Sequence, residues 1–191
     1  VFTPTRYLWG ESAEDYMSTS LSHLIHPYLS YLKQWDFIAA QRADLVVTLS
    51  NHSAQKIKEF YERDALVLPP PFDYSYWENT AKDLHKITLP FHEYYLVVSR
   101  LEPYKKIDIA LTACLNQQKN LVVVGAGSQK NKLKQMAGDN VFFIDNIKDT
   151  ELGSVYSHAE AVLMPQIEDF GLVALEAQFF GCPVLAYEKG G

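Results

Sequence analysis

The sequence has few cysteines, no CxxC motif and no long apolar run. Its 191 residues include two cysteines, Cys114 and Cys182, each in an apolar context (LTACL and GCPVL) without metal-ligand spacing. Buried free thiols in a reducing compartment are the simplest interpretation. No apolar run reaches the roughly 18 to 20 residues that a membrane helix needs, and no signal peptide is present, so we expect a cytoplasmic protein.

Basic tracts and clustered metal ligands are lacking as well. The formal net charge is −6 at pH 7 and the pI is near 5.5, so a general nucleic-acid binder is excluded and any bound phosphate should be small and locally held. The histidines are isolated, and we expect no metal site. They are His23, His26, His52, His85, His92 and His158. The 48% hydrophobic content is that of a globular chain with a sizeable core.

The chain also lacks an initial Met. It opens on VFTPT, which is typical of a strand end, and stops on Gly190-Gly191 directly after an apolar strand pattern, PVLAY. We therefore expect a fragment with two domains, both incomplete. The predicted organisation is an N-terminal domain over 1–72, a stiff Pro-rich and aromatic linker over 73–92, and a C-terminal domain over 93–191.

The first domain begins with a long helical pattern from about Ser12 to Arg42, interrupted near Pro27. Its apolar stripe comprises Leu21, Leu24, Ile25, Tyr28, Leu29, Leu32 and Trp35. We favour a core-facing stripe over a membrane-facing one, because the polar face is not rich in Lys or Arg.

A strand–helix–strand unit follows. ADLVVTLS reads as a buried parallel strand, Ser50 or Asn51 as the N-cap of a helix to about Tyr61, and ALVLPPP as the closing strand. Such a unit predicts a right-handed βαβ crossover.

From Tyr94 onward, apolar strands and helices alternate. The predicted strands are YYLVVS, LVVVG, VFFI, AVLM and PVLA, and the helices cover 106–115, 129–136, 150–156 and 171–180. This alternation indicates an α/β fold with a doubly wound parallel sheet, whose ligand crevice lies at the carboxyl ends of the strands.

The stretch from Pro165 to Val184 places Glu168 and Glu176 on either side of Phe170-Gly171. A helix beginning at Gly171 leaves its first N–H groups unpaired and its dipole favours an anion there. Glu176 emerges one turn later from an apolar stripe and needs hydrogen-bond donors. The alternative is that Glu168 and Asp169 merely cap the helix and that the Glu176 carboxylate reaches water.

Two further loops face the same crevice. SRLEPYKKID carries Arg100 and Lys105, a pair suited to a diphosphate, although a solvated basic loop is the alternative. GAGS departs from the GxGxxG dinucleotide motif because its third position is Lys130. Gly125 and Gly127 then permit either close backbone approach to a ligand or a tight turn.

Taken together, Arg100, Lys105, Glu168 and Glu176 resemble the family-4 (group 1) retaining glycosyltransferases of the GT-B fold. The resemblance covers TPTRYLW, SRLEPYKKID, VVGAGS and the stretch from residue 165 to the end. It implies two Rossmann-like domains, with a nucleotide-diphosphate sugar bound in the C-terminal one and a glycan or lipid-linked acceptor facing it. The opening segment looks most like surface-glycan mannosyltransferases.

The resemblance also implies roles for single residues. Arg100 and Lys105 would hold the diphosphate, Glu176 the ribose hydroxyls, and Glu168 the hydroxyls of the transferred sugar. Amides of Phe170, Gly171 and Leu172 would lie near sugar and phosphate. The implied enzyme is a retaining hexosyltransferase that uses no metal cofactor and contacts the inner membrane face at most peripherally.

Two other functions stay open. Relatives commonly have a histidine where this chain has Phe2, so a non-catalytic nucleotide-sugar-binding or scaffold module is the alternative. A glycoside hydrolase using Glu168 and Glu176 as paired carboxylates ranks lower, because it has no use for a diphosphate clamp. The sequence leaves the nucleotide base, sugar, acceptor, linkage and oligomeric state open.

Overall fold

The computed structural model describes residues 3–10 and 22–191, and the chain forms two compact units. Unit 1 comprises Val1–Pro71, Glu168–Phe170 and Lys189–Gly191. Unit 2 comprises Phe72–Ile167 and Gly171–Glu188.

Unit 1 contains the predicted strand–helix–strand element. Strands β1 (Val47–Thr48) and β2 (Leu66–Val67) pair in parallel, and helix α3 (Asn51–Tyr61) connects them. The side chain of Ser50 caps α3 by accepting a hydrogen bond from the Ser53 amide. Of the two predicted N-cap residues, Ser50 is the cap, and the predicted end of the helix at Tyr61 is confirmed.

Helix α2 (Ser22–Gln41) differs from its prediction in two ways. It continues through Pro27 without interruption, although Pro27 has no N–H to donate to the carbonyl four residues earlier. The residues before 22 in the predicted range, 12–21, lie outside the described part of the chain.

The predicted core-facing stripe of α2 is wrong for three of its four described side chains, and only Leu29 is half-buried. Tyr28 is 71% exposed, Leu32 42% and Trp35 62%. The face that packs inward carries Phe37 and Ala40 instead, against a small core of Val46, Ile57 and Tyr61. The helix is therefore rotated away from the orientation that its apolar spacing predicts.

Asp36 of α2 connects the TPTRYLW segment to this core. Its carboxylate accepts hydrogen bonds from the Trp9 indole and the Tyr61 hydroxyl, each at 2.7 Å, and from the Thr5 hydroxyl at 3.2 Å. Burial, together with the hydrogen bond to Asp36, raises the pKa of Tyr61 to about 12. The opening segment thus has a structural role in unit 1.

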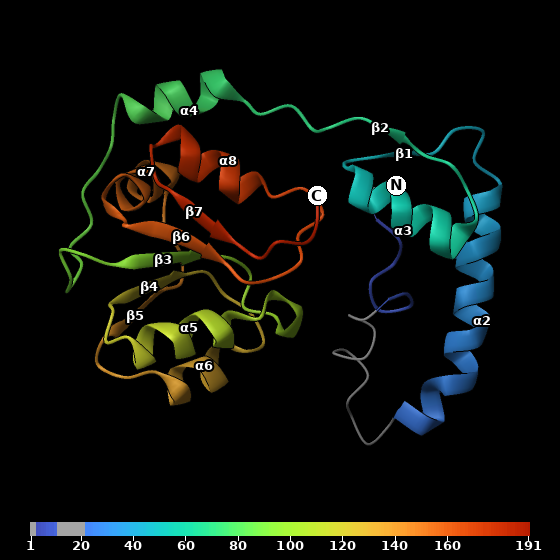
Figure 1. Ribbon diagram of the computed structural model, residues 1–191, viewed down its shortest axis with the longest axis horizontal. Coiled ribbons are helices and arrows are strands. Elements are labelled where there is room, and N and C mark those ends of the chain that lie inside the picture. Colours follow the sequence, from blue (N-terminus) through green and yellow to red (C-terminus); the bar gives the residue numbers. More distant parts are fainter. Residues whose placement is uncertain (1–2, 11–21) are drawn as a thin grey trace. The chain divides into compact units, whose positions relative to one another are not determined.

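Unit 2 is a five-stranded parallel sheet in the order β5-β4-β3-β6-β7, as predicted for a doubly wound domain (Figure 1). The strands are β3 (Tyr95–Val98), β4 (Leu121–Val124), β5 (Val141–Ile144), β6 (Ala161–Met164) and β7 (Val184–Ala186). The helices are α4 (Tyr74–Ala81), η1 (Pro103–Lys105), α5 (Ile107–Asn116), α6 (Lys130–Met136), α7 (Asp149–His158) and α8 (Leu172–Phe179).

Both faces of the sheet are covered, which explains why its inner strands are apolar throughout. Helices α5 and α6 lie on one side of the sheet, and α4, α7 and α8 lie on the other (Figure 1). A separate hydrophobic core lies on each side. Along β3, Leu96 belongs to the core beneath α4, α7 and α8, and Val97 belongs to the core beneath α5 and α6. Alternate residues of a strand thus serve two separate cores.

The segment predicted to be a linker, 73–92, is partly helical and packs on unit 2. The Trp77 ring on α4 is 8% exposed and meets Phe180 edge-on with ring centroids 5.6 Å apart. After the helix, the His85 amide donates to the Thr150 carbonyl at 3.2 Å. One of the aromatic residues that suggested a stiff connector, Trp77, is thus the buried residue through which a helix packs, whereas Tyr74 and Tyr76 are exposed.

Candidate functional site

The carboxyl ends of β3 and β6 form the point where the strand order reverses. β3 pairs with β4 on one side and with β6 on the other, and the chain proceeds outward in both directions. Loops after two such strands diverge and leave a crevice between them, which is where open α/β sheets bind ligands. The loop after β3 carries Arg100 and Lys105, and the loop after β6 leads to α8.

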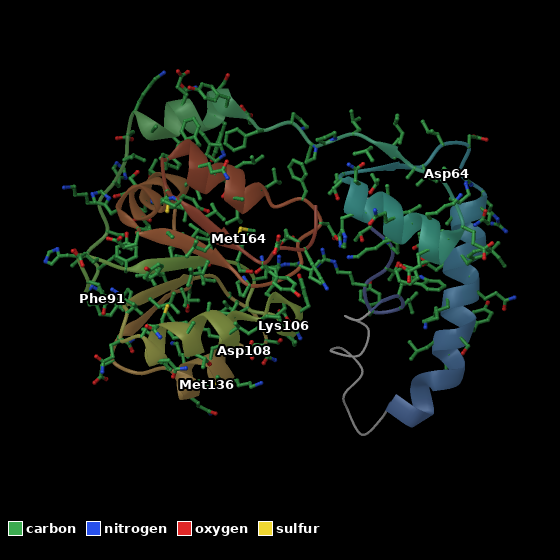
Figure 2. The ribbon with its side chains drawn as sticks, in the orientation of Figure 1. Asp64, Phe91, Lys106, Asp108, Met136 and Met164 are labelled. Atoms are coloured by element: carbon green, nitrogen blue, oxygen red, sulfur yellow. The ribbon has the colours of Figure 1, made fainter. Side chains whose placement is uncertain are left out.

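Arg100 and Lys105 are organised around one buried tyrosine. The guanidinium of Arg100 donates to the Tyr104 hydroxyl at 2.7 Å, and Lys105 Nζ lies 5.4 Å from the Tyr104 ring centroid. The Tyr104 ring is only 8% exposed, whereas Arg100 is exposed. The structure therefore brings the two predicted cations together on the same tyrosine, in the segment between β3 and α5. Figure 2 marks the beginning of α5 with Lys106 and Asp108.

Gly125 and Gly127 allow the loop after β4 to lie directly against the loop after β3. A Cβ atom at Gly125 would be 1.9 Å from the Ser99 carbonyl oxygen, and one at Gly127 would be 2.5 Å from the Leu101 carbonyl oxygen. Between these positions the Leu101 amide donates to the Ala126 carbonyl at 2.9 Å. The neighbouring backbone is thus sufficient reason for both glycines, without a ligand.

Glu102 joins the same two loops. Its carboxylate accepts from the Ser128 hydroxyl at 2.6 Å and from the Ser128 amide at 3.1 Å. These hydrogen bonds lower the pKa of Glu102. The loop that carries Arg100 and Lys105 is therefore supported by the one beside it.

Helix α8 begins at Gly171, whose φ of 92° is a left-handed conformation that favours glycine. Gly171 at the N-cap has no side chain to cap the helix, and the Asp169 carboxylate is bound to Arg6 and Lys56, so Asp169 does not serve as the predicted cap. The first-turn amides, including that of Leu172, have no acceptor within the helix. The amino-terminal end of α8 thus retains the hydrogen-bonding capacity that an anion requires.

Glu176 is half-buried on α8, and its donor is Tyr156 of α7. The Tyr156 hydroxyl donates to Glu176 Oε2 at 3.0 Å. Burial raises the pKa of Glu176, the Tyr156 hydrogen bond lowers it, and the charge of Asp149 raises it, with a net upward shift. The predicted need for a donor is met by a residue that the sequence pattern did not single out.

The other predicted residues, Glu168 and Phe170, belong to unit 1. The Glu168 backbone bridges in parallel to Gly190, and the Gly191 amide donates to the Glu168 carbonyl at 2.9 Å. A Cβ at Gly190 would lie 2.4 Å from that same carbonyl oxygen. The glycines of the EKGG loop therefore let it pair with the acidic loop.

Asp169 is a buried acid between two cations. It is 5% exposed, forms an ion pair with Arg6 and lies 3.2 Å from Lys56 Nζ. Burial raises its pKa, but Arg6 and Lys56 outweigh that effect and the net shift is downward. The sequence pattern did not reveal this pairing, because Arg6 and Asp169 are 163 positions apart.

Two absences concern only residues 3–10 and 22–191. Within them, no group of three or more His, Cys, Asp or Glu side chains is placed to hold a metal ion. None of the helices in this part of the chain combines the length and apolarity that a membrane span requires. Phe2, the predicted departure from the related sequences, lies outside the described residues.

The fold and site define a class of protein: a doubly wound α/β domain whose switch point carries a basic loop and an uncapped helix terminus. The sequence profile described as glycosyl transferases group 1 matches residues 85–191, more than half of the chain. The chain belongs to that family. The predicted group 1 membership is confirmed, whereas retention and mannose specificity stay predictions.

Curated relatives agree with this assignment. A D-inositol 3-phosphate glycosyltransferase of Acidothermus cellulolyticus is 31% identical over 182 residues, covering 82% of this chain and 40% of that protein. An uncharacterised glycosyltransferase of Methanocaldococcus jannaschii is 28% identical over 178 residues, covering 86% of this chain and 45% of that protein. The chain thus spans less than half the length of these relatives.

Solved structures identify the fold as GT-B, as predicted. The sucrose-phosphate synthase of Thermosynechococcus elongatus has a TM-score of 0.65 at 22% identity, over 83% of this chain and 44% of that one. The catalytic domain of starch synthase IV from Arabidopsis thaliana, bound to ADP and acarbose, has a TM-score of 0.61 at 16% identity, over 81% and 41%. At such identities the likeness establishes architecture alone.

Proposed function

We propose that this chain carries the donor-binding part of a retaining hexosyltransferase, which moves a sugar from a nucleotide-diphosphate sugar to an acceptor. The observation that carries the proposal is the convergence at the β3–β6 switch point. Arg100 and Lys105 lie together on the loop after β3, and the uncapped end of α8 follows the loop after β6. Cationic side chains and helix amides are the groups that proteins use for diphosphates.

Each group has a defined task in this proposal. Arg100 and Lys105 bind the diphosphate and stabilise the charge that develops on the departing nucleotide, so that the transfer requires no metal ion. The Glu176 carboxylate accepts hydrogen bonds from the ribose hydroxyls. Glu168 binds hydroxyls of the transferred sugar, and amides near Phe170 and Gly171 complete the site.

The finer features are proposals of the same kind. The configuration at the anomeric carbon is retained, and the leaving phosphate takes the proton of the acceptor hydroxyl. Mannose carried by GDP is the first donor to test, because the opening segment resembles surface-glycan mannosyltransferases. We place the enzyme in the cytoplasm, with peripheral contact to the inner membrane face and a glycan or lipid-linked acceptor. The names of several relatives add a phosphorylated inositol to the acceptors worth testing.

A thermal-shift panel tests donor binding directly. We expect one of GDP, UDP, ADP, GDP-mannose and UDP-glucose to raise the melting temperature with concentration, because a ligand bound only by the folded state stabilises it. At 100 times the Kd this stabilisation is about 2.7 kcal/mol. Glu176→Ala should abolish the shift.

Glu160→Ala is the matched control. Glu160 is exposed and directly precedes β6, so it lies at the opposite edge of the sheet. We expect this variant to keep the full shift. If no nucleotide stabilises the wild-type chain, or if both variants behave alike, the donor-site proposal is wrong.

A further inference from the structure

Glu176 is held through one of its two carboxylate oxygens. Oε2 accepts the hydrogen bond from Tyr156 at 3.0 Å, and Oε1 accepts none from the described residues. The carboxylate is only half-buried. One oxygen is therefore committed to the protein, and the other keeps its capacity to accept hydrogen bonds from a ligand.

Tyr156 is suited to fix that orientation because its side chain is closely packed. Its side chain is fully buried, and its ring stacks on Phe180 with centroids 6.0 Å apart and an interplanar angle of 13°. Burial and the Glu176 carboxylate raise the pKa of Tyr156, so the hydroxyl keeps its proton and donates. A donor on a rigid ring selects one rotamer of a flexible glutamate.

The surroundings oppose the charge that this hydrogen bond supports. Burial is the largest influence that raises the pKa of Glu176, and the charge of Asp149, at the start of α7, adds to it. The Tyr156 hydrogen bond lowers the pKa of Glu176, and Cys182 adds to the influences that raise the pKa of Tyr156. Without Tyr156, the half-buried carboxylate would be protonated more readily.

We propose that Tyr156 is a positioning residue of the donor site, whose hydroxyl holds Glu176 Oε2 so that Oε1 is presented to the ribose hydroxyls of the nucleotide. This inference rests on the proposed function. Tyr156 touches no reacting atom in it. The residue acts by keeping Glu176 ionised and in the rotamer that accepts two vicinal hydroxyls.

The first test needs no nucleotide. The carboxyl carbon of Glu176 is titrated by ¹³C NMR in the wild-type chain and in Tyr156→Phe, which keeps the ring and removes only the hydroxyl. We expect the midpoint to rise by about one pH unit, because a hydrogen bond to the ionised form is lost. An unchanged midpoint would refute the positioning role.

The second test uses the nucleotide selected by the thermal-shift panel. At pH 7, Tyr156→Phe should bind it about tenfold more weakly, as expected for a lost hydrogen bond to a charged group. As the pH is lowered, the nucleotide affinity of Tyr156→Phe should begin to fall at a higher pH than the affinity of the wild type does. In a Glu176→Gln background, Tyr156→Phe should have no further effect, because the two residues act as one unit.

Two controls separate positioning from folding. Tyr94 is another buried tyrosine of unit 2, and its hydroxyl donates to the Val155 carbonyl at 2.9 Å. Tyr94→Phe should lower stability without changing nucleotide affinity. If Tyr156→Phe does not fold, Glu176→Asp replaces it, since the shorter acid keeps its charge but loses reach to Tyr156; full affinity in that variant would overturn the inference.

The outcomes distinguish this inference from the proposed function. If the nucleotide binds, but Tyr156→Phe lowers its affinity equally in the wild-type and Glu176→Gln backgrounds, the positioning role is refuted and the donor-site proposal stands. A shifted midpoint in a chain that binds no nucleotide refutes the donor site, and the inference falls with it.

Discussion

Single positions show how closely backbone segments approach one another at the crevice of unit 2. Gly125 has a φ of 141°, and the place where its Cβ would stand is occupied by the Ser99 carbonyl. Gly181 also has a positive φ, of 75°, but nothing lies within 4 Å of the corresponding position. The two glycines are alike in sequence terms, and only their surroundings distinguish them.

Gly125→Ala should therefore destabilise unit 2 by about 3 kcal/mol, the upper end of the range for overpacking, and displace the loop that carries Arg100. Gly181→Ala should lose only about 1 kcal/mol, the cost of a side chain in a left-handed conformation. Urea unfolding followed by far-ultraviolet circular dichroism measures both. Equal losses would show that the close approach to Ser99 has no energetic weight.

At the scale of whole elements, helices α4 and α7 pack against each other. Trp77 of α4 is buried, and the Tyr76 hydroxyl donates to Asp149 of α7. Gly153 of α7 makes room for this packing, since a Cβ there would lie 2.7 Å from both Leu84 and Phe180. Helix α4 is thus part of the core of unit 2, although it stands in a segment with the composition of a linker.

Trp77→Ala should destabilise unit 2 by about 3 kcal/mol, as large-to-small core substitutions of aromatic residues do. Glu78→Ala, one residue further along the same helix, is exposed and should change stability by less than about 0.5 kcal/mol. Urea titration of both variants tests the assignment. If α4 were a connector that packs on nothing, the two variants would have the same free energy of unfolding.

At the scale of the whole molecule, the two units carry acids with opposite pKa shifts, a buried one in unit 1 and a half-buried one in unit 2. In unit 1, Arg6 and Lys56 hold the pKa of Asp169 below 3.8 in spite of its burial. In unit 2, burial raises the pKa of Glu176 above 4.5. An acid whose pKa is lowered by folding stabilises the folded state when ionised, whereas one whose pKa is raised opposes folding.

The two units should therefore respond to acid differently. The contribution of Asp169 is fully present above its unfolded pKa of 3.8 and is lost as the pH falls through its lower folded value. Asp169→Asn at pH 7 should cost unit 1 about 2 kcal/mol, in the range for a lost hydrogen bond to a charged group. Asp169→Asn should also remove most of the loss of unit 1 stability that occurs at low pH.

Hydrogen exchange of the α3 amides, followed by mass spectrometry between pH 3 and pH 7 with correction for intrinsic rates, reports on unit 1 separately. Unchanged protection in Asp169→Asn at pH 7 would contradict this prediction. Glu176→Gln should have the opposite sign and stabilise unit 2 at pH 7, at the expense of donor binding.

The sequence by itself determined the order and type of the elements in unit 2 from β3 onward, an N-cap of α3 at Ser50 or Asn51, and the position of Arg100, Lys105 and α8 at one edge of the sheet. These features follow from hydrophobic period, caps and strand polarity, which act over a few residues or follow from the connectivity of a parallel sheet.

Only the tertiary structure decided which face of α2 is buried, that α4 packs through Trp77, and that Gly125 meets the Ser99 carbonyl. It alone also paired Tyr156 with Glu176, 20 positions apart, and Asp169 with Arg6. The physical reason is that such contacts depend on which distant segments are brought together, and no local period or propensity encodes that choice.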